Sequence, residues 1–519
     1  MNLRIGLIAH SASWEQILLQ EGVPYFNDDP ATLVATCSAI VVNRTLDVNE
    51  RNLLEEYLQS GGAVLGSAAH LDGVCGTQSS SEWNEYLVAD HDEIFAGVTL
   101  VDIGAEIRIP REANHLRTQH NSHAVFAGPL GGGYAVILPF DLAALMTDTR
   151  AAHKSFYAGR DRLPTERVSL VNKAELHHLL HDALKYLHGA RSFPYAHLWY
   201  FPDGRKNVFA FRIDTDKGSR QEIDALYHAA IEFDVKMSWF LDVKSHEEWL
   251  QHFAFLAGQE IGIHCYEHQV FDSYDENLKN ITKAKLKLER AGIASSGFTA
   301  PFGMWSVELG RAIDKVGFEY SSEFSYAYDA LPLFPMNKDV FFYALQLPIH
   351  PICIGSLKQA GYSEVQMNDY FTRVIDAKLA RDEPLFFYHH PTHHCFDVMK
   401  DIFRRIEELG IGNVTMLEFA RWWRRRLKGT YSVEISTESL RIDLGKMDDS
   451  VWLRVIHPDA REAIVRSSGI VNLNEIAWTS QEQYEVPDDI RRIREFDPRQ
   501  MFGNIFRTVT KKITERKYK

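Results

Sequence analysis

Two pairs of side chains that could bind a metal follow two short apolar runs near the middle of the chain. Asp214 and Asp216 come directly after one run, and His264 and His268 come directly after another. Each run has the length of a buried strand, so both pairs are predicted to lie at strand ends. Carboxylate oxygen and imidazole nitrogen both suit zinc and its first-row neighbours, and a position left open would hold water. The pattern predicts a divalent-cation site.

A third polar motif, His389-His390-Pro391, ends a further apolar run. A His-x-x-x-His spacing by itself is more often structural than metal-binding. Its position between an Asp-x-Asp pair and a later His-His-Pro motif reverses that balance in favour of a metal site. His393 and His394 are interpreted as surface histidines, and His350 is a further candidate for the pocket wall.

Repeated strand–helix units fill residues 196–430 and position these motifs. Apolar runs alternate there with amphipathic stretches such as residues 221–233 and 307–316. A further helix is predicted at 247–257, and the last strand at 414–416. Units of this kind close into a barrel more readily than into an open sheet, and barrel chemistry sits at the C-terminal ends of the strands. Every polar motif falls at such an end. The predicted fold class of this segment is α/β, with a (β/α) barrel.

In their order these motifs resemble the polysaccharide deacetylase family, which has NodB homology and forms carbohydrate esterase family 4. The resemblance spans most of residues 196–430. It implies a distorted (β/α) barrel that holds one divalent metal, with zinc expected and cobalt, nickel or manganese as alternatives. It also implies a role for each motif residue: Asp214 as the base, Asp216, His264 and His268 as metal ligands, and His390 as the acid.

Three departures from the family pattern concern the site. Thr215 is inserted in the acidic pair. Thr299-Ala300-Pro301 has threonine where the family has an arginine that orients the aspartate, and Arg212 is the candidate to replace it. Tyr320-Ser321-Ser322-Glu323 lacks the family's aspartate.

Residues beside the motifs are candidates for substrate contacts. The backbone N–H of Phe302 is expected to help bind an oxyanion, and Arg212 belongs to the same group of contacts. The rings of Phe302, Tyr266, Trp305 and Trp239 are candidates for stacking on a sugar, with core packing an equally good interpretation of Trp239.

The predicted activity is metal-dependent hydrolysis of an acetyl group, N-acetyl rather than O-acetyl, on a sugar or glycoconjugate. Activated water, an aspartate base and a histidine acid would carry the reaction. Two alternatives stay open. One is a degenerate barrel that binds glycan or scaffolds partners without catalysis, and the other is a metal-independent C–N hydrolase of the same fold.

Residues 1–195 are predicted to form a flavodoxin-like domain, because strands and helices alternate there as well. The stretch from 49 to 66, with the strand that leads into Pro139-Phe140-Asp141, resembles a class I glutamine-amidotransferase-like domain. Such enzymes carry a nucleophilic cysteine on a turn after a strand. Here the corresponding strand has no cysteine, and Cys75 lies beyond it in a predicted loop. His10, His70 and Cys75 are interpreted as ordinary loop residues, and the domain as non-catalytic.

Residues 431–519 are predicted to form a small antiparallel β domain that ends in a basic amphipathic helix. Polar and apolar residues alternate over 430–444, and apolar residues of 499–519 recur at helical spacing beside seven basic ones. Such a helix could lie on an anionic membrane, on the protein's own core or on a second subunit. Peripheral membrane contact and a homo-oligomer are both open.

Composition limits the remaining choices. The 519-residue chain has a formal net charge of −14, which argues against general nucleic-acid binding. Five scattered cysteines without a Cys-x-x-Cys pair indicate a reducing compartment. The N-terminus lacks a signal-peptide pattern, and no apolar run approaches the ~20 residues needed to span a bilayer. A cytoplasmic location is expected, with the inner membrane face as a variant.

Overall fold

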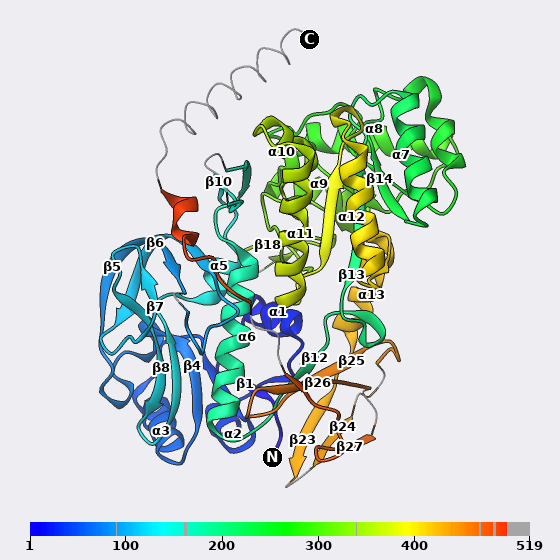
Figure 1. Ribbon diagram of the computed structural model, residues 1–519. Coiled ribbons are helices and arrows are strands. Elements are labelled where there is room, and N and C mark those ends of the chain that lie inside the picture. The colour runs from blue at the N-terminus through cyan, green and yellow to red at the C-terminus, as the bar shows by residue number, and fades with distance from the viewer. Residues whose placement is uncertain are drawn as a thin grey trace.

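The computed structural model describes residues 1–495, apart from 90, 160–162, 339, 437–438, 444, 446, 467–468 and 481–483. Figure 1 shows an N-terminal α/β part (blue to cyan) beside a central α/β part (green to yellow), with the C-terminal strands (orange) below the central part. The predicted helix 499–519 lies outside the described residues, so its contacts stay a prediction. In the described ranges, no helix is both long and apolar enough to cross a membrane.

The N-terminal part is built on a nine-stranded sheet in the order β2-β1-β3-β4-β9-β8-β7-β5-β6. The first five strands are parallel, and the remaining pairs are antiparallel. The strands are β1 Ile5–Leu7, β2 Tyr25–Asn27, β3 Ala39–Val42, β4 Ala63–Ser67, β5 Ser79–Val88, β6 Leu100–Pro110, β7 His115–Thr118, β8 His123–Leu130 and β9 Gly133–Leu138.

Helices pack on both faces of the parallel strands. Val41 lies in a core with residues of α1 and α6, whereas its neighbours Ile40 and Val42 lie in a second core with α2 and α3, because successive strand side chains point to opposite faces. Asp47 and Glu50 begin α3 with a capping box. The helices are α1 Ala12–Glu21, α2 Pro30–Thr36, α3 Val48–Gln59, α4 Ala68–Leu71, α5 Leu142–Met146 and α6 Lys173–Ala190, with the 3₁₀ turn η1 Val74–Gly76.

The parallel strands β2-β1-β3-β4-β9 follow the strand order typical of flavodoxin-like sheets. The antiparallel half, β5 to β8, was not predicted. Strand β5 is mostly polar and partly exposed, so it contains no apolar run that would predict a strand. The flavodoxin-like and amidotransferase-like assignments therefore stay predictions.

The central part contains a parallel sheet in the order β20-β17-β16-β15-β14-β13-β21, with β22 also paired to β13. Strand neighbours follow chain order, and β21 returns to lie beside β13, so the sheet curves into a half-barrel. His350 N–H donates to Phe386 O at 3.0 Å across the open side. The strands are β13 Val208–Asp214, β14 Met237–Leu241, β15 Glu260–Ile263, β16 Gly297–Phe298, β17 Tyr320–Ser321, β20 Leu345–Gln346, β21 Leu385–His389 and β22 Gly412–Asn413.

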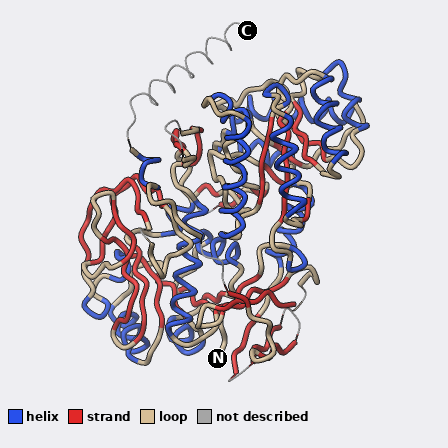
Figure 2. Tube along the Cα trace, viewed as in Figure 1, coloured by secondary structure: helices blue, strands red, loops and turns tan. Residues whose placement is uncertain are grey.

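Helices lie around this sheet, as Figure 2 shows. Ser306 caps α9, and Thr415 with Glu418 forms a capping box at α13. The helices are α7 Arg220–Glu232, α8 Tyr274–Arg290, α9 Val307–Val316, α10 Ile354–Gln359, α11 Glu364–Ala380, α12 Phe396–Glu408 and α13 Met416–Lys428. The 3₁₀ turns are η2 Pro202–Gly204, η4 Pro301–Gly303 and η5 Pro391–His393, and two short hairpins are β10 Ala151–Ser155 with β11 Thr165–Ser169 and β18 Met336–Asn337 with β19 Val340–Phe341.

Two element predictions in the central part were wrong. Residues 247–257 do not form an α-helix but the 3₁₀ segment η3 Glu247–Phe255, which Trp249 interrupts with non-helical dihedral angles (φ −138°, ψ 26°). The last strand was predicted at 414–416, but β22 ends at Asn413 and Met416 already begins α13.

The C-terminal strands share a sheet with the linker. Strand β12 Tyr195–Leu198, at the predicted domain boundary, pairs with β25 Trp452–Ile456. Leu3 N–H donates to Val433 O at 2.8 Å, which joins a second sheet to the N-terminus. The other elements are β23 Ser432–Ser436, β24 Ser439–Asp443, β26 Arg461–Arg466, β27 Gly469–Asn472, β28 Thr479–Ser480 and η6 Ile490–Arg494. Whether these strands form an independent domain stays a prediction.

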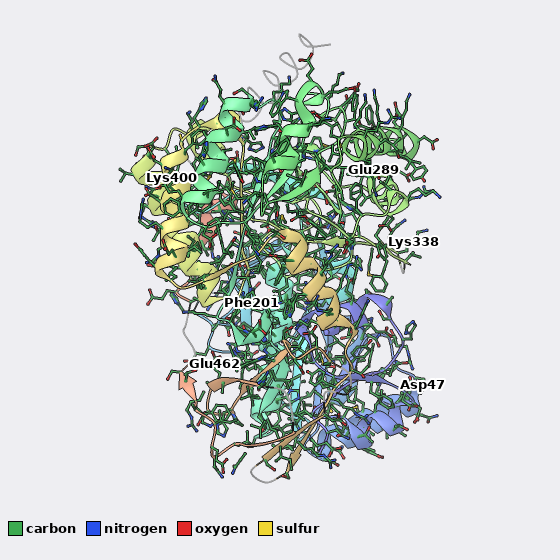
Figure 3. All side chains as sticks on the ribbon, turned by 90° about the vertical axis from the view of Figure 1, so that its right-hand side faces the viewer. Asp47, Phe201, Glu289, Lys338, Lys400 and Glu462 are labelled. Carbon is green, nitrogen blue, oxygen red and sulfur yellow. The ribbon has the colours of Figure 1, made fainter. Side chains whose placement is uncertain are left out.

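Buried residues of the linker and of α13 join the three parts. Phe201, labelled in Figure 3, lies between the central part and the two others and is fully buried. Arg426 of α13 is also fully buried, and its guanidinium donates to the main-chain oxygens of Gln20 and Glu21, at the end of α1, and of Leu198 on β12. One side chain thus satisfies the terminal carbonyls of a helix in another part of the molecule.

Candidate metal centre

The acidic pair lies at the C-terminal end of β13. Asp214 is the last residue of the strand and is buried. Asp216 follows with a φ of 41°, a region that aspartate enters more readily than most residues. The hydroxyl of the inserted Thr215 accepts the N–H of Asp242 at 3.1 Å and bonds His246 Nε2 at 2.9 Å. The insertion therefore ties the end of β13 to the segment after β14.

The two predicted histidines face Asp216 from the end of β15. His264 Nε2 and His268 Nε2 lie 3.4 and 3.2 Å from Asp216 Oδ1, and the two Nε2 atoms are 3.1 Å apart. His264 Nδ1 lies 3.0 Å from the main-chain oxygen of Thr299 and 2.8 Å from its hydroxyl. Because a carbonyl oxygen only accepts, Nδ1 carries the proton and the Nε2 lone pair is directed at the cluster. The structure brings the three predicted ligands together.

Their geometry fits a divalent cation. In a tetrahedral site with bonds of about 2.1 Å, ligand atoms are roughly 3.4 Å apart. Asp216 Oδ1 is buried and has no hydrogen-bond partner among the described residues. One carboxylate oxygen and two imidazole nitrogens suit zinc and its first-row neighbours. Asp216, His264 and His268 can therefore hold such an ion.

The charges around the cluster favour a cation at its centre. Burial raises the pKa of Asp216, but His390, His264 and His268 outweigh burial and hold this pKa well below its usual value. Burial lowers the pKa of His264, but Asp214 and Asp216 outweigh burial and raise it. An ionised carboxylate thus lies beside an imidazole whose protonated form is stabilised. A metal cation can take the place of that proton.

Asp214 is held by an arginine of its own strand. Arg212 Nη2 donates to Asp214 Oδ2 at 2.8 Å, and Nη1 donates to the main-chain oxygen of Ser322 at 2.6 Å. Both charged side chains are buried. Asp214 Oδ1 has no hydrogen-bond partner in the described part of the chain. Arg212 thus orients one oxygen of Asp214, and its replacement of the family arginine stays a prediction.

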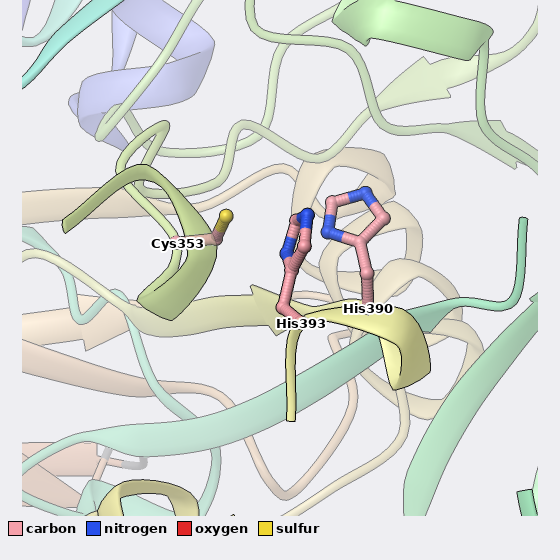
Figure 4. Close-up of side chains that lie close together, drawn as sticks. All are labelled: Cys353, His390 and His393. Carbon is pink, nitrogen blue, oxygen red and sulfur yellow. The ribbon is translucent and has the colours of Figure 1, made fainter. Parts of the chain in front are cut away.

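His390 approaches the cluster from the loop after β21. Its Nε2 lies 3.8 Å from Asp216 Oδ2, and its Nδ1 is buried without a hydrogen-bond partner in the described ranges. Burial lowers the pKa of His390 well below its usual value, so the imidazole is neutral near pH 7. Figure 4 shows His390 beside His393 and Cys353, and one ligand atom of each lies within 4.8 Å of the others. His393, predicted to be a surface residue, is thus half-buried at this side of the site, whereas His394 is exposed.

Of the aromatic rings predicted to contact substrate, Phe302 is the one that the structure places beside the cluster. Its ring centroid lies 5.0 Å from that of His268. Tyr266 is covered by Lys283, whose Nζ lies 3.6 Å from the ring centroid. Trp305 packs in the hydrophobic core of the N-terminal part. Tyr266 and Trp305 therefore have partners away from Asp216.

Two other candidates belong to the interior. His350 Nδ1 lies 3.1 Å from both carboxylate oxygens of Asp329, and Nε2 lies 3.0 Å from the Tyr370 hydroxyl. Trp239 is fully buried, and its indole N–H donates to Gln259 at 3.1 Å. Both side chains are satisfied by the protein itself and are core residues.

Asp242 is a site residue that the sequence analysis missed. It follows the last residue of β14 and is buried, with Oδ1 unpartnered among the described residues and Oδ2 accepting from Ser245 at 2.5 Å. Burial raises its pKa, and the charge of Asp216 adds to that rise. The available signal was the one that identified Asp214, an acid directly after an apolar run.

Glu323, in the motif that lacks the family's aspartate, is fully buried. It accepts the main-chain N–H of Ala300 at 3.2 Å and the Gln346 amide at 3.1 Å. Burial raises the pKa of Glu323 to about 7. Through Ala300 it supports the segment that carries Thr299, which anchors His264.

The candidate nucleophile region of the N-terminal part has other partners. Cys75 donates its main-chain N–H to Glu55, and burial raises the pKa of its thiol. His70 Nδ1 lies 3.3 Å from Val42 O, and His10 bonds Glu15. These contacts agree with a structural interpretation of the three residues.

Comparisons with known proteins return structures only. No family model and no curated protein matches the chain. A structure described as a polysaccharide deacetylase from Mycobacterium smegmatis is 17% identical, with a TM-score of 0.38, over 43% of this chain and 92% of that one. A CE4 family pseudoenzyme from Bacillus anthracis is 16% identical, with a TM-score of 0.31, over 42% and 66%. A family 4 acetyl xylan esterase from Clostridium thermocellum, in complex with cobalt, is 16% identical, with a TM-score of 0.30, over 41% and 90%. Since the TM-scores lie below 0.5, the chemistry below rests on the site's own geometry.

Proposed function

We propose that the central part is a metal-dependent hydrolase that removes an acetyl group, N-acetyl in preference to O-acetyl, from a sugar or glycoconjugate. The observation that carries the proposal is the convergence of Asp216, His264 and His268 within 3.4 Å of one another, beside the buried Asp214. A divalent metal bound there, zinc first among the candidates, would polarise a carbonyl group and lower the pKa of water. The choice of an acetylated sugar rests on the resemblance of the motifs to polysaccharide deacetylases.

The attacking water would lose its proton to Asp214. Oδ2 of Asp214 is bound by Arg212, whereas Oδ1 has no hydrogen-bond partner among the described residues, so Oδ1 is the accepting atom. The ion pair with Arg212 holds this carboxylate in one orientation. The main-chain N–H of Phe302 is the proposed donor to the oxyanion.

The leaving group would receive its proton from His390. A neutral imidazole can deliver a proton only after it has accepted one. Negative charge that develops near Asp216 during the reaction would raise the pKa of His390, so that it takes a proton from solvent and passes it to the leaving group. Solvent and substrate can reach this side of the cluster, because the side chains of Asp216 and His268 are 27% and 24% exposed.

The test measures metal content and acetate release from an N-acetylated oligosaccharide, using the full chain. His264→Ala with His268→Ala is expected to lose one equivalent of bound metal and all detectable turnover. His120→Ala, at an exposed histidine outside the cluster, is the matched control and should keep both. Unchanged metal content and turnover in the double variant would overturn the proposal.

The same measurements separate the alternatives. Turnover that survives complete removal of metal would favour the metal-independent C–N hydrolase. Sugar binding with a loaded site and no turnover would favour the non-catalytic, glycan-binding barrel. For the rest of the molecule we propose a non-catalytic N-terminal part, a cytoplasmic location and membrane or subunit contact through residues 499–519, all on the sequence arguments given above.

A further inference from the structure

A second histidine–carboxylate cluster lies outside the barrel, where α1, α6 and β12 meet. Glu21 ends α1, His177 and His181 are one turn apart on α6, and His197 lies on β12. All four side chains are buried. One ligand atom each of Glu21, His181 and His197 lies within 4.8 Å of the others, and His177 Nε2 lies 2.7 Å from Glu21 Oε2. We call these four residues the interface cluster.

The carboxylate of Glu21 is oriented by two tyrosines. Tyr195 donates to Oε1, and Tyr200 donates to Oε2 at 2.8 Å. His181 Nδ1 lies 2.8 Å from Oε1. A carboxylate offers about four acceptor positions, so two tyrosine hydroxyls leave room for a cation. The tyrosines would then support the ligand from behind, as outer hydrogen-bond partners do in metal sites.

One buried imidazole nitrogen of the cluster, His197 Nε2, has no hydrogen-bond partner among the described residues. His197 Nδ1 donates to the main-chain oxygen of Leu198 at 3.0 Å, which leaves the lone pair on Nε2. A buried unpartnered nitrogen is costly, and one that lies in a cluster with a carboxylate and a second imidazole needs an explanation.

We propose that Glu21, His181 and His197 hold a divalent cation of the zinc class at a buried site, with His177 beside the carboxylate. One carboxylate and two imidazoles suit such an ion, and burial of these side chains keeps substrate out, as in structural sites. The ion would join the N-terminal part to the linker strand. This proposal does not depend on the hydrolase proposed for the barrel.

Access is compatible with the site. His177 and His181 line a cavity of about 360 Å³, which gives an ion an entry path.

The experiment counts bound zinc in the full chain after chelator stripping and reconstitution with zinc alone. We expect two equivalents in the wild type and one in His181→Gln with His197→Gln. His264→Ala with His268→Ala is also expected to keep one equivalent, because it empties only the barrel site. Combining all four substitutions should leave none. His120→Gln, at an exposed histidine away from both sites, is the matched control and should keep two.

A thermal measurement guards against a loss of metal that follows from misfolding. In the His264→Ala, His268→Ala background, zinc is expected to raise the unfolding midpoint by a few degrees through the interface cluster. Adding His181→Gln and His197→Gln should abolish that rise while circular dichroism stays that of a folded chain. The proposal is overturned if His181→Gln with His197→Gln keeps the wild-type zinc content. A barrel site that fails to bind would instead show in the His264 and His268 variants alone.

Discussion

In the barrel centre, one oxygen of Asp216 has no hydrogen-bond partner among the described residues, and the side chain is 27% exposed. In the interface cluster, by contrast, both oxygens of Glu21 accept hydrogen bonds from tyrosine hydroxyls, and the side chain is fully buried. Each carboxylate meets imidazoles of a His-x-x-x-His spacing, at His264 and His268 in a loop after a strand and at His177 and His181 on a helix. The same ligand types thus serve an open site that substrate can reach and a closed one that it cannot.

Two fully buried glutamates show what decides the charge in each region. Burial raises the pKa of Glu323, near the barrel centre, to about 7, since no neighbouring cation outweighs it. Burial acts on Glu21 in the same direction, but three histidines outweigh it and hold the pKa well below its usual value. Burial alone therefore does not identify an ionised carboxylate. The groups in contact with the carboxylate decide as well.

The difference between the open barrel centre and the buried interface cluster predicts its largest effect on catalysis. Asp214→Asn removes the proposed base but none of the proposed ligands, so kcat/KM for acetate release should fall roughly 10²- to 10⁴-fold. Zinc content should stay that of the wild type, measured on the same preparation. A variant that keeps its turnover would show that Asp214 Oδ1 does not accept the proton and would leave the barrel centre a binding site only.

The next largest effect is expected on stability, at the buried ion pair of Arg212 and Asp214. Arg212→Met leaves the Asp214 charge buried without its partner, so the free energy of unfolding of the central part should fall by about 3–5 kcal/mol. Urea denaturation followed by tryptophan fluorescence measures it. Arg212→Met with Asp214→Leu removes both charges and should recover most of the loss. A single variant as stable as the wild type would mean that water or another cation already compensates Asp214.

A pH dependence follows from Glu323. Its folded pKa of about 7 lies above the ordinary value of 4.5. Between pH 4.5 and 7 the unfolded chain ionises this group while the folded chain keeps it neutral, so its contribution to stability falls as pH rises and is constant above pH 7. The loss amounts to about 3 kcal/mol at most.

Glu323→Gln should remove that slope, since an amide does not titrate. Stability curves of the two proteins, measured from pH 4.5 to 8, should therefore diverge with rising pH in favour of the variant. Any change in the hydrogen bond with Gln346 adds an offset that is independent of pH. Parallel curves would show that Glu323 is ionised in the folded chain, as Glu21 is.

Sequence patterns predicted the barrel's helices and strands well, because each βα unit carries its own apolar period and capping residues, as at α9 and α13. They failed where the local signal was weak. Strand β5 is largely polar, and η3 has helical composition but breaks at Trp249. The pairing of β12 with β25 joins residues about 250 positions apart, and no local pattern reports such a contact.

Candidate ligands were predictable wherever an acid or histidine directly follows an apolar run. That rule found Asp216 and His264 and, applied to β14, would also have found Asp242. It could not find Glu21 and His197, which lie on a helix and a strand whose meeting depends on tertiary structure. The helical spacing of His177 and His181 was visible in the sequence, but nothing local supplied the carboxylate that completes the cluster.

The smallest expected effect concerns Thr299, which stands where the polysaccharide deacetylases have an arginine. Its hydroxyl and its main-chain oxygen both lie within hydrogen-bond distance of His264 Nδ1. In the interface cluster, His197 Nδ1 is bound by a main-chain oxygen alone. Thr299→Val deletes the hydroxyl but keeps shape and carbonyl, so zinc affinity of the barrel site should fall only about 10-fold, the lower end of the range for such outer partners.

A competition titration against a zinc chelator measures this change, with Thr299→Ser as the variant that keeps the hydroxyl and the wild-type affinity. The interface cluster lies on other elements, so its zinc should bind as before in both variants. If Thr299→Val binds zinc as tightly as the wild type, the carbonyl alone fixes the His264 tautomer, and the two regions orient their histidines in the same way. If affinity falls and serine restores it, the hydroxyl is what distinguishes the open site from the closed one.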